Sequence, residues 1–220
     1  MADKNLSLTN EPITVWFWGH SFIRRLEQFC IQYYEDHGNM GLVPESHLVY
    51  FKSHSGAKVT DCRRDLKIIK QVEAEMVFLD IGSNDLDTPD PQPHLLAREV
   101  VAIAHHILDT YEDVKVVVIC EILFRSIHSR YPLTNPNFVC DAHRYNNMIK
   151  ILIEKLSETY RNGIQFCHHR GLVENWSSFL EDGVHLNLEG MRKYQKSLRR
   201  AILCHSPWVR QKRQLDRAKD

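Results

Sequence analysis

Apolar positions recur along the chain with two different spacings. Short runs rich in β-branched and aromatic residues predict buried strands, and apolar residues at helical spacing between them predict helices. The strand-like runs cover residues 13–18, 47–51, 76–81, 114–120 and 163–167. The helix-like segments cover residues 21–34, 59–72, 96–111, 145–160 and 188–203. Because the two kinds alternate, we expect a three-layer α/β/α domain with a five-stranded parallel sheet.

The composition is typical of one globular domain. The chain has 220 residues, 43% hydrophobic and 25% charged, which excludes disordered, collagenous and coiled-coil proteins. No apolar run approaches the roughly 18 residues that span a bilayer, and the start, MADKNLSLTNEP, lacks a secretory signal pattern. We therefore expect an intracellular, cytoplasmic protein without a transmembrane segment. Its six cysteines form no C-x-x-C pair, which favours buried, reduced thiols.

The formal net charge of zero hides an asymmetry. From Arg192 onward the chain has ten basic and two acidic residues, a local charge of +8 that the remainder balances. We expect residues 1–12 to form a polar lead, 13–204 the domain, and 205–220 a basic tail beyond the last helix. The basic end could contact a polyanion weakly, either nucleic acid or an acidic membrane, or it could be a solvated terminus.

Polar residues follow the predicted strands, where a parallel sheet gathers its active groups. Ser21 opens a helix as a nucleophile or an ordinary N-cap. Gly56 can present a backbone N–H or be a plain loop glycine, and Asn84 offers an oxyanion donor or an Asx-turn. Asp182 and His185 suit an orienter and a general base, or belong to a surface loop. Each signal is weak alone, but together they supply the parts of one site.

These segments resemble the SGNH, or GDSL-like, hydrolase superfamily, named for Ser, Gly, Asn and His in four blocks. Ser21 matches the first block, Gly56 the second, Asn84 in GSND the third, and Asp182 with His185 in DGVHLN the fourth. The resemblance runs from about residue 13 to 203 and implies a flavodoxin-like strand order. More narrowly, GHSFIRRL, DIGSNDL and DGVHLNLEGMRKYQKSLR are similar to esterase-like SGNH domains of animal genomes, some of them linked to retrotransposons.

The resemblance implies a serine esterase that needs neither a metal nor an organic cofactor. Ser21 is then the nucleophile, His185 the general base and Asp182 its orienter. The Ser21 N–H, the Gly56 N–H and the Asn84 side chain form the oxyanion hole. The implied substrate is an ester of a small molecule, a lipid or a carbohydrate. We expect a short acyl chain because the domain is small and the sequence shows no separate lid.

The sequence departs from the family pattern at His20. The first block is usually Gly-Asp-Ser, and here histidine replaces the aspartate; we expect a packing role for it. The lost aspartate motivates an alternative, a catalytically weak or silent SGNH-like binding module. The pairs His105–His106 and His168–His169 raise a metal enzyme as a further alternative, although no H-x-x-x-H spacing occurs.

Two loops, 82–94 and 121–139, are expected to shape the substrate pocket. The second loop contains Arg125, Arg130 and Tyr131, which would favour an anionic or sugar substrate if they faced the site. We interpret them instead as ordinary surface-loop residues.

Overall fold

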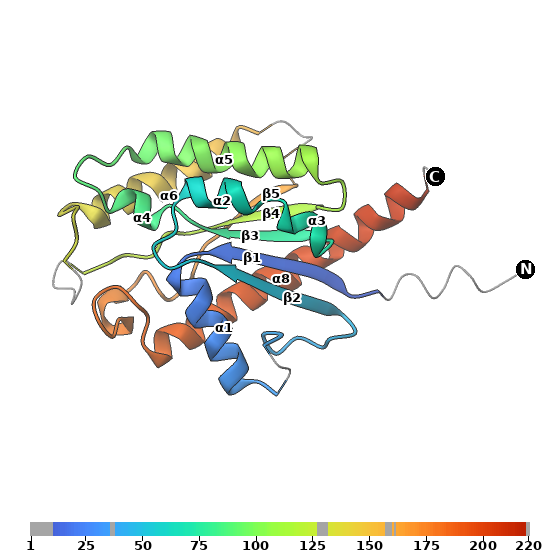
Figure 1. Cartoon of the computed structure of the whole chain (residues 1–220), viewed down its shortest axis with the longest axis horizontal. Helices are drawn as coiled ribbons and strands as arrows, with labels where there is room; N and C mark the ends of the chain where they lie inside the picture. The colour runs from blue at the N-terminus through green and yellow to red at the C-terminus, as the bar shows by residue number, and fades with distance from the viewer. Residues whose placement is uncertain (1–10, 36–37, 127–131, 157–159, 161, 219–220) are drawn as a thin grey trace, which may run out of the picture.

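The structure is a computed structural model that describes residues 11–35, 38–126, 132–156, 160 and 162–218. Within these ranges, one parallel sheet lies between two layers of helices, as Figure 1 shows. None of the helices in this part of the chain is both long and apolar enough to cross a membrane.

The sheet has five parallel strands in the order β2-β1-β3-β4-β5. They are β1 (Ile13–Gly19), β2 (His47–Ser53), β3 (Met76–Asp80), β4 (Val116–Cys120) and β5 (Ile164–Cys167). This is the flavodoxin-like order, so the predicted fold class is confirmed. Gly19, the last residue of β1, is in register with Ser53 on one side and Asp80 on the other. The loops that follow β1, β2 and β3 therefore leave the sheet side by side.

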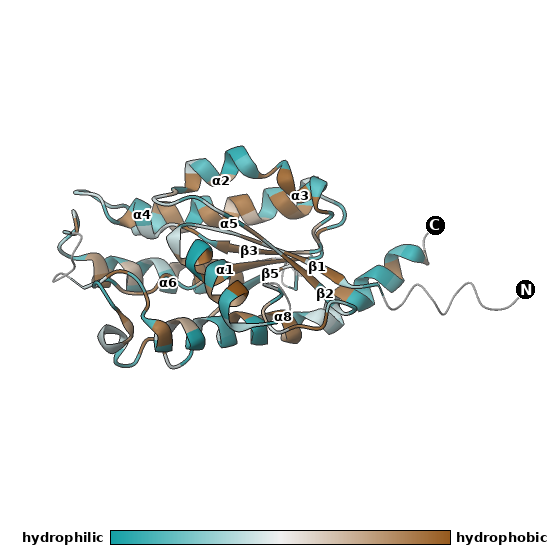
Figure 2. Ribbon diagram, turned by 60° about the horizontal axis from the view of Figure 1, so that its bottom comes forward, coloured by the Kyte–Doolittle hydropathy of each residue, from teal (hydrophilic) through white to brown (hydrophobic). Residues whose placement is uncertain are grey.

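Helices cover both faces of this sheet. They are α1 (Ser21–Tyr33), α2 (Val59–Asp65), α3 (Ile68–Gln71), α4 (Ser83–Leu86), α5 (Pro93–Thr110), α6 (Phe138–Glu154), the 3-10 helix η2 (Trp176–Phe179) and α8 (Leu188–Arg217). α1 and α8 pack against one face, and α2, α3, α5 and α6 against the other. Figure 2 shows the hydrophobic strands enclosed between these two layers.

Alternate residues of the three central strands, β1, β3 and β4, enter different cores. Trp16 and Trp18 of β1 pack on the α5 side of the sheet, whereas Val15 and Phe17 pack on the α8 side. Phe17 also stacks on Phe78 of β3, with 4.5 Å between the ring centroids. Burial on both faces explains why the strands are continuous apolar runs rather than alternating ones.

Some predicted boundaries are wrong. The segment 59–72 forms two helices, because the Ile69 N–H donates to Leu66 O at 3.0 Å, an i,i+3 bond that tightens the chain between them. α6 begins at Phe138 rather than near Tyr145, and the one-turn helix α4 was not predicted. All six cysteines are free, but Cys140 and Cys204 are exposed rather than buried.

The predicted end of the last helix near residue 203 is also wrong, because α8 continues to Arg217. Pro207 lies inside the helix, and its lack of an N–H removes one helical hydrogen bond without ending the helix. Burial explains the continuation: Ser206 contacts His47 Nε2 at 2.8 Å, and Val209 is fully buried. Ile202, Ser206 and Val209 thus extend the inward face of α8 past the proline.

Candidate active site

Ser21 is the first residue of α1, two positions after the end of β1. Gly19 allows this sharp junction: a Cβ there would lie 2.5 Å from Ile23 Cγ1 and 2.7 Å from Asp80 O. Any larger residue would therefore push the start of α1 away from the end of β3. The junction places the Ser21 hydroxyl at the carboxyl edge of the sheet and at the positive end of the α1 dipole.

Asp182 and His185 lie in the loop between η2 and α8. An antiparallel bridge between Leu180 and Leu186 closes the base of this loop. Asp182 Oδ1 accepts hydrogen bonds from the backbone N–H groups of Val184 and His185, at 2.9 and 2.7 Å. Burial alone would raise the pKa of Asp182, but these bonds and the His185 side chain outweigh it and lower the pKa below its ordinary value. The carboxylate is therefore charged at neutral pH.

His185 joins the two other predicted members of the triad. Its Nδ1 lies 2.7 Å from Asp182 Oδ2, and its Nε2 lies 3.0 Å from Ser21 Oγ. The ring edge also packs against Phe22, with 6.1 Å between ring centroids and an interplanar angle of 86°. This packing and the carboxylate fix the orientation of the imidazole. The arrangement has the geometry of a nucleophile, a base and an orienter.

Gly56 and Asn84 approach the same place from the loops after β2 and β3. Gly56 has φ +75°, in the left-handed region that favours glycine, and a Cβ there would meet nothing within 4 Å. Asn84 belongs to α4, and its Nδ2 donates to Ala57 O at 2.9 Å. This bond ties the amide to the turn that contains Gly56.

These residues lie in or next to one hollow of about 290 Å³. Four of the five predicted site residues line it, and Asp182 lies behind His185. The complete lining is Ser21, Arg24, Arg25, Ser55, Gly56, Asn84, Asp87, Arg125, Leu133, Val184 and His185. Residues distant in the sequence therefore meet in one small hollow at the carboxyl edge of the sheet.

His20 packs as expected, with 5.1 Å between its ring centroid and that of Phe22, and it also has a polar role. It caps α1: its Nδ1 accepts from the Phe22 N–H at 3.4 Å, and its Nε2 lies 2.9 Å from Ser83 Oγ. Because Nδ1 accepts, the neutral ring carries its proton on Nε2 and donates to Ser83. Burial lowers the pKa of His20 to about 4, although nearby Asp80 opposes the shift. The imidazole is therefore neutral at pH 7.

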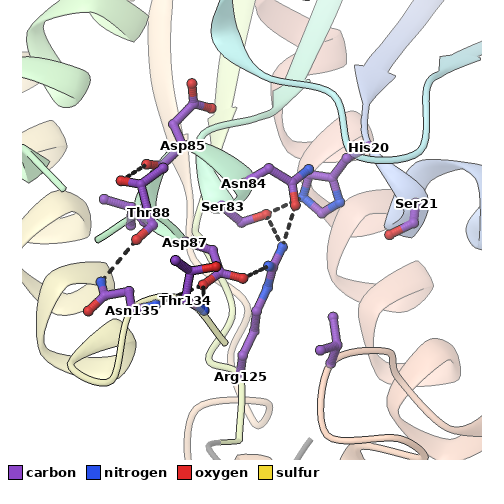
Figure 3. A network of polar contacts seen from close by, with 12 residues as sticks. His20, Ser21, Ser83, Asn84, Asp85, Asp87, Thr88, Arg125, Thr134 and Asn135 are labelled. Atoms are coloured by element: carbon purple, nitrogen blue, oxygen red, sulfur yellow. Dashed lines mark hydrogen bonds and ion pairs between the residues drawn. The ribbon is translucent and has the colours of Figure 1, made fainter. Parts of the chain in front are cut away.

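Arg125 lies at the site, so its interpretation as a surface-loop residue is wrong. Its side chain is 6% exposed and lines the hollow between Asn84 and Asp87, as Figure 3 shows. Its place soon after the end of β4 was the available signal, because the carboxyl ends of parallel strands share one edge. Arg130 and Tyr131 lie outside the described residues.

The histidine pairs considered as metal ligands are engaged in other contacts. His168 Nδ1 lies 2.7 Å from Glu121, while His169 is fully buried with Nδ1 3.0 Å from Ser197 Oγ. In the ranges that the structure describes, no group of three or more His, Cys, Asp or Glu side chains could hold a metal ion.

Comparison with known proteins identifies the fold. No family model matches the chain, and no curated protein matches it in sequence. A GDSL-like lipase from Bacteroides thetaiotaomicron superimposes with a TM-score of 0.65 at 14% identity, covering 86% of this chain and 87% of its own. The acetyl xylan esterase AlAXEase gives 0.65 at 16% identity, over 86% of this chain and 100% of its own. A mutant of an acetyl-xylooligosaccharide esterase from Geobacillus gives 0.59 at 14% identity, over 87% and 94%. The chain therefore shares its fold with these three proteins.

Proposed function

We propose that this protein is a serine esterase that transfers the acyl group of an ester to water. One observation carries the proposal: His185 contacts Ser21 and Asp182 through its two different ring nitrogens, at 3.0 and 2.7 Å. The fold supports it, because proteins that share this fold include a GDSL-like lipase and an acetyl xylan esterase.

In the proposed reaction, Asp182 accepts the Nδ1–H of His185, which leaves Nε2 free to accept the Ser21 proton. As Ser21 Oγ forms a bond to the carbonyl carbon, the proton passes to Nε2. Collapse of the tetrahedral intermediate breaks the bond to the leaving oxygen, and His185 returns the proton to the departing alcohol. Water then attacks the acyl-enzyme in the same way and releases the acid and free Ser21.

Three donors are proposed to bind the developing oxyanion. The Ser21 N–H stands at the start of α1, where the first N–H groups have no partner within the helix. The Gly56 N–H and the Asn84 amide complete the set, since both residues line the same hollow as Ser21. Because such donors act on charge that appears only in the transition state, loss of one typically lowers turnover by ~10²–10³.

The size of the hollow favours a short acyl chain. At about 290 Å³ it is at or below the lower end of common ligand pockets, roughly 300–1,000 Å³. We infer an ester of a small molecule, a lipid or a carbohydrate in which only a small acyl group enters the site. The intracellular location and the narrower resemblance to animal domains stay predictions from the sequence.

A panel of p-nitrophenyl esters of increasing acyl length tests the proposal. We expect the highest kcat/KM on the shortest esters, with losses of at least about 10³-fold in Ser21→Ala and His185→Ala. The matched controls are Ser46→Ala and His94→Ala, which should both retain activity. Ser46 precedes β2, at the amino edge of the sheet, and His94 is exposed on α5. Absence of turnover on every ester by the wild type would contradict the proposal.

The silent binding module is the competing hypothesis, and a serine-directed fluorophosphonate probe separates the two. An active serine esterase should be labelled in the wild type and lose the label in Ser21→Ala. If neither protein is labelled, Ser21 is not an activated nucleophile and the binding module is the better interpretation.

The basic end of the chain supports a second and independent candidate function, weak contact with a polyanion. Lys193, Lys196 and Arg200 of α8 line a hollow of about 450 Å³ together with Arg170. No Asp or Glu is among the described residues that line it. Three of the ten basic residues that the sequence places at this end therefore line one surface depression.

Binding of single-stranded RNA and of vesicles with anionic lipid at increasing salt tests this contact. We expect Lys193→Gln, Lys196→Gln and Arg200→Gln together to weaken binding to one of the two probes and to reduce its salt dependence. A matched triple on the other face, Arg63→Gln with Lys67→Gln and Lys70→Gln, removes the same charge elsewhere. Equal losses in both triples would exclude a specific contact at α8.

A further inference from the structure

Arg125 is held directly behind the proposed oxyanion donor Asn84. Its Nη2 lies 2.8 Å from Asn84 Oδ1 and 2.8 Å from Ser83 Oγ, and its Nη1 lies 3.4 Å from Asp87 Oδ2. Figure 3 shows the guanidinium entering between these three side chains. The cation therefore meets protein acceptors on two of its nitrogens instead of projecting freely toward a substrate.

The contact with Arg125 determines which way the Asn84 amide faces. A guanidinium can only donate, so the oxygen of the amide must face Arg125 and the nitrogen must face away. The nitrogen then donates one hydrogen to Ala57 O at 2.9 Å. Its second hydrogen remains available to the hollow that Asn84 lines with Ser21. With the amide reversed, an N–H group would oppose the guanidinium and no hydrogen would face the oxyanion.

Arg125 is itself fixed by its surroundings. Asp87 Oδ1 accepts from the backbone N–H groups of Thr134 and Asn135, at 2.7 and 3.1 Å, so the carboxylate that pairs with Arg125 is held in place. The guanidinium carbon also lies 5.0 Å from the ring centroid of Phe138, which is fully buried. These contacts hold the guanidinium in one position. Its hydrogen bond to Oδ1 then holds the Asn84 amide in one orientation.

We propose that Arg125 is a positioning residue that orients and polarises the Asn84 amide toward the oxyanion. A cation on the amide oxygen draws electron density from the amide nitrogen and makes its N–H a stronger donor. The stronger N–H donor stabilises the ester oxygen only when that oxygen becomes charged. It therefore lowers the energy of the transition state rather than that of the bound substrate. This inference rests on the proposed esterase function, in which Asn84 is an oxyanion donor.

The first test examines the amide and needs no activity. The side-chain NH₂ signals of Asn84 in a ¹⁵N–¹H spectrum, assigned by their loss in Asn84→Asp, report its environment. We expect them to shift or broaden in Arg125→Met and to stay in place in Arg24→Met, which removes a cation from the same hollow. If they are unchanged in Arg125→Met, the positioning role is wrong whatever the enzyme does.

The second test separates binding from turnover on a p-nitrophenyl ester. We expect Arg125→Met to lower kcat by about 10- to 100-fold with KM within about threefold, less than the ~10²–10³ loss in Asn84→Ala. The double variant should be no slower than Asn84→Ala alone, because Arg125 acts through Asn84. A double variant slowed by the product of both effects would overturn the inference, as would a change confined to KM.

Folding and function are controlled separately. Arg125→Lys keeps the charge but has a single nitrogen, which cannot replace both Nη2, beside Ser83 and Asn84, and Nη1, beside Asp87. It should therefore recover only part of kcat even if Arg125→Met proves unstable. Arg63→Met, an exposed arginine on α2, should match the wild type in both tests. If the wild type hydrolyses no ester, the proposed function fails, while the amide signals still decide whether Arg125 positions Asn84.

Discussion

His20 and Ser83 are joined across the ends of β1 and β3 by a contact of 2.9 Å between Nε2 and Oγ. The imidazole uses both nitrogens, since Nδ1 also accepts the N–H of Phe22 and caps α1. An ionised aspartate at this position could only accept. Histidine thus keeps the capping acceptor, adds a donor, and avoids placing a second carboxylate near Asp80, whose Oδ1 lies 3.6 Å from Nε2.

The neutral state of His20 makes stability depend on pH. Its pKa is about 4 in the folded protein and near 6.5 when the chain is unfolded, so the unfolded state binds more protons between these values. The contribution is fully present above pH 6.5 and is lost as the pH falls toward 4. From pH 7.5 to 5, this group should remove about 2 kcal/mol from the free energy of unfolding.

Urea denaturation of His20→Asn at pH 7.5 and 5 checks this expectation. Asparagine places an acceptor near the position of Nδ1 but does not titrate, so the loss on acidification should shrink by about 2 kcal/mol relative to the wild type. His94→Asn, which changes an exposed histidine, should keep the wild-type pH dependence. Identical slopes in all three proteins would show that His20 titrates normally.

His20→Asp introduces the aspartate of the SGNH pattern. The unfolding free energy of this variant should depend on pH in the direction opposite to the contribution of His20. In His20→Asp, two buried carboxylates would share the space beside Ser83, since Asp80 is only 3% exposed. Like charges in one buried site raise the pKa of one carboxyl, so we expect a loss of about 1–3 kcal/mol in unfolding free energy at pH 7.5. The loss should diminish near pH 5, where a shared proton removes the repulsion. A variant as stable as the wild type at pH 7.5 would mean that the pocket tolerates both charges.

Asp182→Asn tests the proposed role of Asp182 as the group that orients His185, and it should keep the loop intact. Asn Oδ1 can still accept the backbone N–H groups of Val184 and His185, but its NH₂ would then face His185 Nδ1. Nδ1 would become an acceptor, so the ring proton would move to Nε2. A protonated Nε2 could not accept the proton of Ser21. We expect kcat on a p-nitrophenyl ester to fall by about 10⁴-fold with little change in thermal stability.

Glu181→Gln is the matched control for that variant, because it neutralises the neighbouring carboxylate, which pairs with Arg25 at the surface. Its kcat should stay within about threefold of the wild type. Equal losses in Glu181→Gln and Asp182→Asn would indicate that net charge near the loop, rather than the tautomer of His185, controls the rate.

Sequence patterns predict most of this fold because its signals are local. β1, β3 and β4 are apolar runs buried on both faces. The four blocks that contain Ser21, Gly56, Asn84 and His185 each follow or precede an element whose type can be predicted. Their meeting in one hollow then depends only on the parallel sheet, whose strand ends share an edge.

What the sequence does not predict depends on long-range contacts. Arg125 is buried only because Ser83, Asn84 and Asp87, 38 to 42 positions away, accept its hydrogen bonds. The role of His20 likewise needs Ser83, 63 positions away. No local spacing shows such pairings, so the sequence predicts neither the place of Arg125 at the site nor the hydrogen bonds of His20.

The last two turns of α8 belong to the folded domain, and Arg213 is their main attachment. Its guanidinium pairs with the carboxylate of Glu75, which is buried, and also donates to the backbone oxygens of Glu11 and Pro12, both at 2.8 Å. In Arg213→Met the Glu75 carboxylate would keep only the Thr14 N–H, at 3.2 Å. Breaking a buried pair from one side typically costs roughly 3–5 kcal/mol, and partial exposure of Arg213 reduces this to about 3.

Chemical denaturation of Arg213→Met beside Arg217→Met measures this attachment. Arg217 pairs with Glu11 where both side chains are about half exposed, so its loss should cost at most about 1 kcal/mol. Similar costs in the two variants would show that the Glu75 pair contributes no more than a surface pair. If Arg213 is the stronger attachment, deletion of residues 206–220 should also destabilise the domain, because it removes the buried Val209 as well. Neutralising surface charges on α8 is then a cleaner test of polyanion binding than truncation, because it leaves Val209 and Arg213 in place.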